Sequence, residues 1–273
     1  MAVVASPARR RPAKRPWWGT FLLGVWLPIT VILTIWFTSA DSQQFFFPSF
    51  SRILQRTWDL WFGQGLLLSD LLPSFLRILI GLAIALVLGV GLGIVFGLLR
   101  PVEQALRPLT DAARAVPGAA LLPIAMMFLG PGEPMKIALI AFTAMWPIFL
   151  NTIEGVRSVE PLLHSVMDSF HIRRGLRFTS LYLPATMPQV FAGARVSLGI
   201  AVSVMVIVEM FGTPGGVGYL ISFYKNQQLI VNMWTALIIL GVFGYLLNLL
   251  FRIFENRVLG WHRRMVEHAQ GGN

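Results

Sequence analysis

The chain has 273 residues, of which 56% are hydrophobic and 12% are charged, and its formal net charge is +10 at pH 7. A soluble domain carries about 25% charged residues, so too few polar side chains are present here to cover a surface that faces water. The sequence contains no cysteine, which excludes a disulfide scaffold, an iron–sulfur cluster and a thiolate nucleophile. The composition therefore predicts an integral membrane protein.

Six segments of the chain are apolar enough to be membrane spans. A helix needs about 20 mostly apolar residues to cross the hydrocarbon core, and these runs lack the alternation of outer-membrane barrel strands. We therefore predict an all-α membrane protein with about six transmembrane helices, near residues 19–38, 72–99, 112–129, 135–153, 190–211 and 232–254. The third span is the weakest, because Pro117 and Pro123 interrupt it. The spans form a single transmembrane domain at 19–260, between a basic tail at 1–18 and a second tail at 261–273.

The unequal distribution of Lys and Arg predicts the orientation. With the N-terminus in the cytoplasm, 17 of the 22 cations fall on inner segments and five on outer ones, as the positive-inside rule requires. This arrangement needs an even number of spans and makes both tails cytoplasmic. Because the charge is spread over four inner segments, we attribute it to topology and anionic lipid rather than to nucleic acid. A cleaved signal peptide is the alternative for the first span, and it would leave an odd number.

Small residues recur at every fourth position of the second span. They are Gly81, Ala85, Gly89, Gly93 and Gly97. Small residues at this spacing form a smooth ridge on which another helix backbone can approach closely. We predict that the ridge is a helix-packing surface, and the alternative is the general enrichment of glycine in membrane helices.

Four polar residues in or beside the spans are candidates for the solute pathway: Arg77, Asn151, Arg195 and Glu209. An ionisable group inside a span is a functional hypothesis by default. Arg77 and Arg195 could attract an anion, but we favour the interpretation that they snorkel at helix ends. Glu209 lies near the outer end of its span and could instead reach water. The glycine-rich segment 212–218 cannot continue a helix, so we predict a loop that lines the outer mouth.

The sequence lacks the residues that several kinds of catalysis need. A Walker A loop requires glycine directly before its lysine, whereas the three lysines follow Ala13, Met135 and Tyr224. His164 and His171 have no carboxylate cluster beside them, so we predict no metal site. We also predict no catalytic residue and no cofactor. Any uphill transport must then draw its energy from a partner.

The inner loop at 154–189 is too polar for the membrane and too long for a simple turn. Pro161 is typical of a first helical turn, and we expect a helix from there to about Phe170. Its apolar residues form a stripe suited to a groove on another protein, namely Leu162, Leu163, Val166 and Phe170. We expect a second amphipathic stretch that ends at Leu183-Pro184.

Five stretches of the chain together carry a resemblance to a known family. They are Phe75–Gly81, Leu150–Val159, Leu181–Pro188, Gly193–Arg195 and Val208–Ile221. The sequence resembles the inner-membrane permease subunits of binding-protein-dependent ABC importers, closest to the group for sulfonates, taurine, nitrate and related anions. The resemblance covers about residues 48–260. It implies the type I importer permease fold and a multi-pass place in the bacterial inner membrane.

The resemblance also implies partners. These are separate ABC ATPase subunits, a periplasmic or lipid-anchored solute-binding protein, membrane lipid and a second permease copy, most simply in a homodimer. ATP hydrolysis would then occur on the ATPase subunits and not on this chain. In the resembling family, solute specificity lies mainly in the binding protein, so the sequence does not name the solute.

The inner loop departs from the family's signature, which reads E-A-A, three residues, G, nine residues and I-x-L-P. By this spacing His171 stands at the glycine position, and we expect the bend to move to Gly175 because histidine fits a tight turn poorly. Asp168 is a candidate for the missing carboxylate. The resemblance implies that the loop docks on the ATPase, through Ser165, Val166, Met167, Asp168, His171, Arg173, Arg174 and Gly175.

Two other functions compete with transport. The altered signature would fit a degenerate permease-like protein that assembles or senses without transporting. An intramembrane enzyme is disfavoured, because clustered carboxylates and Ser–His pairs are missing from the sequence.

Overall fold

The computed structural model describes residues 17–40, 42 and 44–260. Except for Trp17 and Trp18, the predicted tails at 1–18 and 261–273 lie outside these residues. All regular structure within the described residues is helical, which confirms the all-α fold class. The chain divides into two compact units, Met1–Gln55 and Arg56–Asn273.

The first unit contains helix α1 (Trp17–Ser39) and the start of α2 (Phe50–Thr57). The backbone N–H of Phe50 donates to Ser39 Oγ at 3.2 Å. The rings of Trp36 and Phe50 meet edge to face, with their centroids 5.7 Å apart. These contacts join the C-terminal turn of α1 to the first turn of α2.

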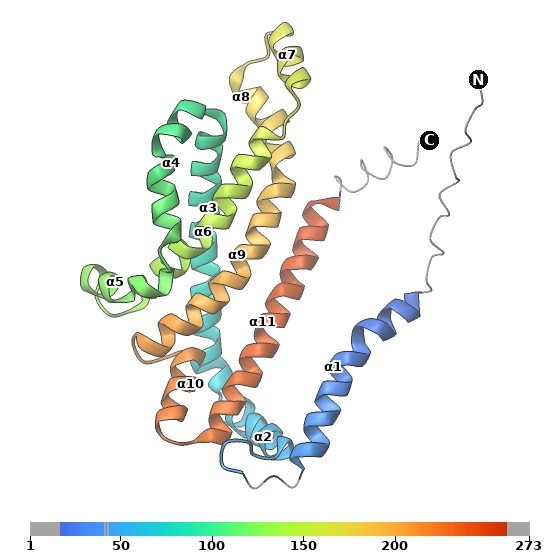
Figure 1. The fold of residues 1–273 in the computed structure, drawn as a ribbon, viewed down its shortest axis with the longest axis vertical. Helices are drawn as coiled ribbons and strands as arrows, with labels where there is room; N and C mark the ends of the chain where they lie inside the picture. Colours follow the sequence, from blue (N-terminus) through green and yellow to red (C-terminus); the bar gives the residue numbers. More distant parts are fainter. Residues whose placement is uncertain (1–16, 41, 43, 261–273) are drawn as a thin grey trace, which may run out of the picture. The chain divides into compact units, whose positions relative to one another are not determined.

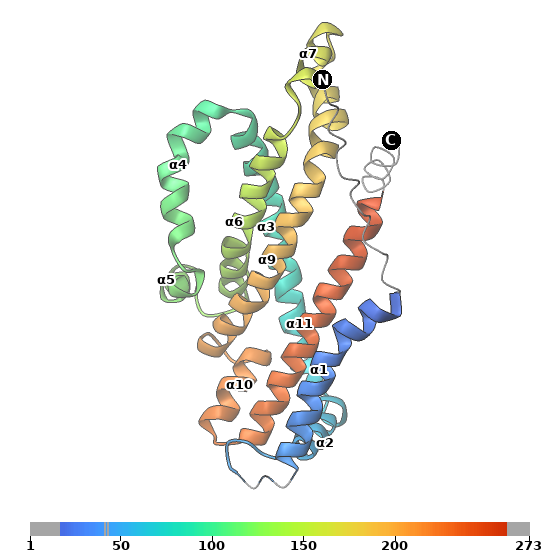
Figure 2. The ribbon, with the colours of Figure 1, turned by 45° about the vertical axis from the view of Figure 1, so that its right-hand side comes forward.

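The second unit begins with the end of α2 and two short π-helical segments, η1 (Trp58–Gly63) and η2 (Leu67–Leu71). The elements that follow are α3 (Leu72–Leu98), α4 (Arg100–Ala115), η3 (Gly118–Leu121), α5 (Leu122–Leu129), α6 (Glu133–Arg157), α7 (Pro161–Ser169), α8 (Arg174–Arg177), η4 (Phe178–Tyr182), α9 (Leu183–Phe211), α10 (Val217–Asn226) and α11 (Ile230–Val258). In Figures 1 and 2, α6 and α9 lie side by side, with α7 beyond one end and α10 beyond the other. We call these the α7 end and the α10 end of the unit.

Four helical segments of the described residues are long and apolar enough to cross a membrane: Leu67–Leu98, Glu133–Arg157, Gly175–Phe211 and Ile230–Val258. The segments Arg100–Ala115 and Gly118–Leu129 qualify as a fifth only if they are counted as one span, and they are bent by 85°. The predicted third span at 112–129 is therefore not one straight helix. Val116 and Pro117 have extended backbone conformations, and Pro117 lacks the N–H that a helix would need there.

The expected helix end at Leu183-Pro184 is wrong. The helical run continues through these residues, from Gly175 to Phe211. Pro184 lies in the first turn of α9, directly after the π-helical segment η4. Proline lacks the N–H group for an i→i−4 hydrogen bond, and the wider π turn accommodates this loss. The helix therefore continues in the same direction.

Helices α3 and α6 pack with their backbones close together. A Cβ atom added to Gly81 would lie 2.6 Å from Ile140, and one added to Gly93 would lie 2.5 Å from Cβ of Thr152. The corresponding contacts of Gly89 and Gly97 are with Ile148 and Val156, at 2.9 and 2.7 Å. In every pair the two residues are 59 positions apart, so the two helices run parallel in a fixed register.

Helix α9 packs antiparallel on α6. Ser197 Oγ donates to the Ala144 carbonyl at 2.5 Å, while Gly193, earlier in α9, lies over Pro147 and Asn151, later in α6. The main apolar core lies among α3, α6, α9 and α11. This arrangement brings the first turns of α3 and α6 to the same end of the unit as the last turn of α9.

Candidate functional site

Arg77 joins three helices at the α10 end. Its side chain is only 6% exposed, so the favoured interpretation that it snorkels to water is wrong. Nε and Nη2 of Arg77 each donate to one carboxylate oxygen of Glu133 at 2.6 Å, and Nη1 donates to Glu209 at 2.5 Å. A two-pronged guanidinium–carboxylate pair is among the stronger charge-assisted hydrogen bonds. Arg77 on α3 therefore ties α6 to α9.

Glu209 is buried and fully hydrogen-bonded. The residue is 1% exposed, so its carboxylate does not reach water in this chain. Its Oε1 atom lies 2.8 Å from Ser74 Oγ, and its Oε2 atom accepts the Gly218 backbone N–H at 2.9 Å. A buried carboxylate is tolerated when a cation and hydrogen bonds compensate for its lost hydration, and Glu209 has both.

Lys136 completes this group of charges. It is fully buried, and its Nζ atom donates to the Thr213 carbonyl at 3.3 Å and lies 3.7 Å from Glu133. We call Arg77, Glu133, Lys136 and Glu209 the Arg77 cluster. Its two cations and two anions cancel in formal charge, so the cluster offers no net attraction to an anionic solute.

The glycine-rich loop at 212–218 is held against this cluster. Gly216 N–H donates to Asp70 Oδ1 at 3.2 Å, and Val217 N–H donates to Ser74 Oγ at 3.1 Å. The carbonyl of Gly215 accepts from Arg77 Nη1 at 3.2 Å. The carboxylates of Asp70 and Glu209 thus accept N–H groups at the start of α10. The free N–H groups and the positive end of the helix dipole favour negative charge there.

Sequence reasoning identified Arg77 and Glu209 but missed Ser74, Glu133 and Lys136. The signal that could have identified them is a pair of polar residues spaced three apart in the first turn of each of two helices. Ser74 and Arg77 are three apart in α3, as are Glu133 and Lys136 in α6. Residues at this spacing share a helix face, and the common register of α3 and α6 brings the two faces together.

The other two pathway candidates lie along α6 and α9 and do not join the cluster. Asn151 Nδ2 donates to the Pro147 carbonyl within its own helix at 2.8 Å. Arg195 forms an ion pair with Glu255 of α11, which links α9 to α11. The Arg195 side chain is 47% exposed, whereas that of Glu255 is 9% exposed.

The inner loop contains the short helix α7 and an ion pair between Asp168 and Arg177. Helix α7 begins at Pro161 and ends at Ser169, which confirms the helix expected from Pro161 to about Phe170. Asp168 Oδ1 accepts from Arg177 Nη2 at 2.7 Å, so the acidic candidate pairs with a cation of its own loop. The apolar stripe residues are exposed, with Leu162 and Phe170 at 68% and 75%. Ser165, Val166, Met167 and Asp168 lie on α7, followed by His171 and Arg173 in the turn.

The expected shift of the bend to Gly175 is wrong. His171 itself adopts the left-handed conformation, with φ of 50°, while Gly175 and Arg174 lie in the helical segment α8. Ile172 N–H donates to the Met167 carbonyl at 3.1 Å, and His171 N–H donates to the Asp168 carbonyl at 3.0 Å. This pair of bonds is the Schellman motif. The helix end therefore imposes the left-handed position on His171, although glycine would adopt it at lower cost.

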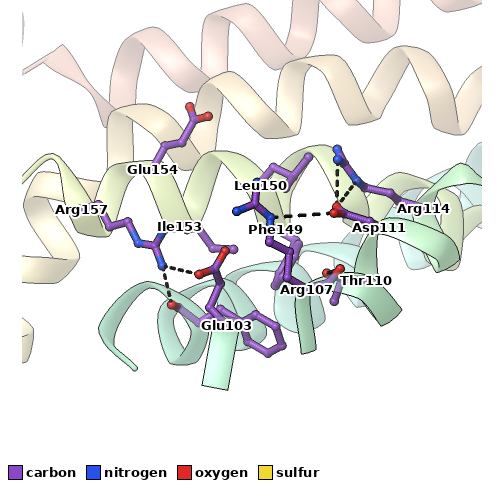
Figure 3. A pocket seen from close by; sticks show the side chains of 11 residues that line it. Glu103, Arg107, Thr110, Asp111, Arg114, Phe149, Leu150, Ile153, Glu154 and Arg157 are labelled. Atoms are coloured by element: carbon purple, nitrogen blue, oxygen red, sulfur yellow. Dashed lines mark hydrogen bonds and ion pairs between the residues drawn. The ribbon is translucent and has the colours of Figure 1, made fainter. Parts of the chain in front are cut away.

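An open pocket of about 230 Å³ lies between α4 and α6. Figure 3 shows that the three arginines of its lining pair with Glu103 or Asp111, across the pocket or along α4. Arg157 meets Glu103 at 3.4 Å, and Arg114 meets Asp111 at 2.9 Å. Its lining holds three arginines and three acidic residues, so it carries no net charge that would select an anion.

The apolar helices, with polar groups gathered at the two ends, define the class of protein: this is a helical membrane protein. Over residues 85–260 the sequence matches the family described as the binding-protein-dependent transport system inner membrane component. The chain belongs to this family. It is a multi-pass permease subunit of an ABC importer of the bacterial inner membrane.

Individual relatives support this assignment. The chain is 30% identical over 239 residues to the nitrate import permease protein NrtB of Synechocystis sp., covering 85% of this chain and 87% of the relative. It is 27% identical over 241 residues to the taurine transport system permease protein TauC of Escherichia coli, covering 86% and 88%. It is 29% identical over 282 residues to the bicarbonate transport system permease protein CmpB of Synechococcus elongatus, covering 97% and 98%. These relatives are transport permeases, which favours transport over the non-transporting alternative.

The fold has a solved counterpart. Inward-facing structures of the MetNI methionine ABC transporter match with a TM-score of 0.59 and 16% identity, covering 69% of this chain and 92% of the matched chain. At this identity the match supports the type I permease fold and nothing about the solute.

Proposed function

We propose that this permease carries a small anion and is driven by a separate ATPase that docks on the loop at 154–189. The single observation that supports the docking surface is the exposed apolar stripe of α7. Its residues are too exposed to contribute to the core of this chain, and an apolar helix face in a polar loop suits a groove on a partner protein. The docking residues are those predicted from the sequence, with Asp168 held in place by Arg177.

The proposed orientation puts the α7 end in the cytoplasm. Arg100, Arg157, Arg173 and Arg177 all lie at or beside this end, and short cytoplasmic loops are enriched in such cations. The α10 end then faces outward, where a solute-binding protein would deliver its cargo. In this orientation α1 and the bent α4–α5 segment complete six spans, with both tails in the cytoplasm.

We propose that two copies of the chain enclose the pathway. Only 6% of the apolar window of α11 is buried within one chain, so lipid and a second copy would cover its remaining surface. Asn151 and Arg195 remain the pathway candidates. Arg77 and Glu209 are better explained as structural partners of each other, because their charges are already paired.

The names of the relatives support the class of solute. Nitrate and bicarbonate are small anions, and taurine carries a sulfonate group. The decisive experiment is uptake into proteoliposomes that contain this permease and its ATPase, with the binding protein added outside. The solutes to compare are nitrate, taurine, ethanesulfonate and bicarbonate, each with ATP inside the vesicles.

Uptake of one of these solutes that depends on both ATP and the binding protein is the expected result. ATP hydrolysis that ignores the binding protein and all four solutes would contradict the proposal and favour the degenerate, non-transporting protein. A Leu162→Ser variant tests the docking surface. Because Leu162 is exposed, the permease should fold normally, but the ATPase should bind more weakly.

A further inference from the structure

One helical run connects the two ends of the second unit. It extends from Gly175 to Phe211 over 37 residues, which corresponds to about 55 Å at 1.5 Å per residue. Its first turn follows the α7 loop, and Glu209 lies in its last turn. A displacement of α9 at the α7 end therefore moves Glu209 as well, provided that the helix stays intact.

We infer that Arg77 and Glu209 are positioning residues that fix the 212–218 loop and α10 to the last turn of α9. A movement of α9 that begins at the ATPase-docking loop is thereby carried to α10 at the outer surface. This inference rests on the proposed function, because it takes the α7 loop as the place where the ATPase acts.

The contacts of the loop support a rigid connection. Glycine-rich surface segments are usually mobile, but here five polar contacts hold the backbone of 213–218. The partner side chains come from η2, α3, α6 and α9, and they are Asp70, Ser74, Arg77, Lys136 and Glu209. Four of them, all but Asp70, are buried, so water does not compete strongly for these bonds.

The Arg77 cluster positions the loop, and most of its hydrogen-bonding groups are already paired. Arg77 uses Nε, Nη1 and Nη2 on Glu133, Glu209 and the Gly215 carbonyl. Both oxygens of Glu209 already accept hydrogen bonds. An anion that displaced Glu209 from Arg77 would leave that carboxylate buried and without its cation, at high cost.

Two adjacent glycines provide a matched test. Gly215 and Gly216 both have positive φ angles, of 104° and 103°. An added Cβ on Gly216 would overlap the Glu209 carboxyl group and lie 2.5 Å from Arg77 Nη1. An added Cβ on Gly215 would meet only Arg77 Nη2, at 3.9 Å. Alanine is strained by the positive φ at both positions, but only at Gly216 does the added Cβ overlap the cluster and push the loop away from it.

The experiment follows the movement of α10 in the complex with the ATPase. The natural chain has no cysteine, so an environment-sensitive fluorophore can be attached specifically in a Lys225→Cys variant, at an exposed position of α10. The change in fluorescence on adding ATP and vanadate is measured in the Lys225→Cys background alone, with Gly215→Ala and with Gly216→Ala. The ATPase rate of each complex is measured in parallel.

We expect Gly215→Ala to keep most of the nucleotide-dependent change and Gly216→Ala to lose most of it. Hydrolysis of ATP should continue in both, because the docking loop is unchanged. Equal fluorescence changes in the two variants would overturn the inference. A purely structural role would instead lower the assembled fraction and the ATPase rate together, with an unchanged response per assembled complex.

A second variant keeps the test decisive if Gly216→Ala does not assemble. Glu209→Gln preserves the size of the side chain but removes the charge that faces Arg77, and it should also uncouple α10 from nucleotide. A normal response in Glu209→Gln would refute the positioning role. Failure of the proposed function looks different, because the unmodified complex would then either bind no ATPase or hydrolyse ATP without regard to the binding protein and the solute.

Discussion

Replacing Gly93 with alanine tests the close approach of α3 and α6. Gly93 is buried, and the added Cβ would lie 2.5 Å from Cβ of Thr152 and 2.9 Å from the Phe149 carbonyl oxygen. Neither atom is the far end of a flexible side chain, so a rotamer change cannot relieve the overlap. The two helix backbones would have to separate along the ridge.

The same helix offers a matched control in Gly91. It is exposed, and an added Cβ would meet nothing within 4 Å. Alanine is favoured over glycine in a helix interior by about 1 kcal/mol, and this gain applies equally at both positions. Overpacking of a well-packed core costs about 1–3 kcal/mol, and this cost applies only to Gly93. We therefore expect Gly93→Ala to be less stable than Gly91→Ala by about 1–3 kcal/mol.

The free energy of unfolding can be measured by titrating the detergent-solubilised chain with SDS and following helicity by circular dichroism. Comparing the two variants cancels the propensity of alanine and most effects of the detergent. If they unfold with the same free energy, within about 0.5 kcal/mol, the close packing of the ridge on α6 is refuted.

Three further predictions concern the loop and α11. Asp168→Ala removes an ion pair with Arg177 in which the Asp168 carboxylate is 68% exposed. Because water screens such a pair, stability should change by about 1 kcal/mol or less, while ATP hydrolysis stimulated by the binding protein falls. An unchanged stimulated rate would remove Asp168 from the docking surface. Arg195→Gln should lower the free energy of unfolding by about 1–3 kcal/mol, and by more than Glu255→Gln does. The first change leaves the buried Glu255 carboxylate unpaired, whereas the second leaves a half-exposed arginine. SDS titration of both variants checks this order. His171→Gly should stabilise the end of α7 by about 1 kcal/mol, seen as roughly fivefold slower amide hydrogen exchange in that helix, and an unchanged exchange rate would argue against strain at His171.

Local properties of the sequence were sufficient to predict the helices and their packing surface. Apolar runs identify membrane helices because each segment must satisfy its own backbone in lipid. The repeat of small residues from Gly81 to Gly97 lies within one helix, so its face is fixed by the helical period. The partner of this ridge was not evident, although β-branched residues at Ile140, Ile148, Thr152 and Val156 repeat at the same multiples of four in α6.

The helix breaks were harder to predict, because proline has different effects in different places. Pro117 separates α4 from η3, whereas Pro147 and Pro184 lie within continuous helical segments. The difference depends on whether neighbouring turns can widen and on what surrounds the freed carbonyl groups. His171 was misjudged for a similar reason, since the hydrogen bonds of the helix end outweighed the preference of the residue.

The sequence by itself determined the class of protein, the helical segments and the family resemblance, because hydropathy, periodicity and motif spacing are read along the chain. Only the tertiary structure decided what Arg77 and Glu209 do. Glu133 and Glu209 are 56 and 132 positions from Arg77 along the chain. The three residues meet because α3 and α6 run parallel and begin at the α10 end, where the antiparallel α9 ends. From the sequence alone, a charged residue in a membrane helix is a candidate for solute contact. The structure shows that Arg77 instead contacts Glu133 and Glu209 and so connects three helices.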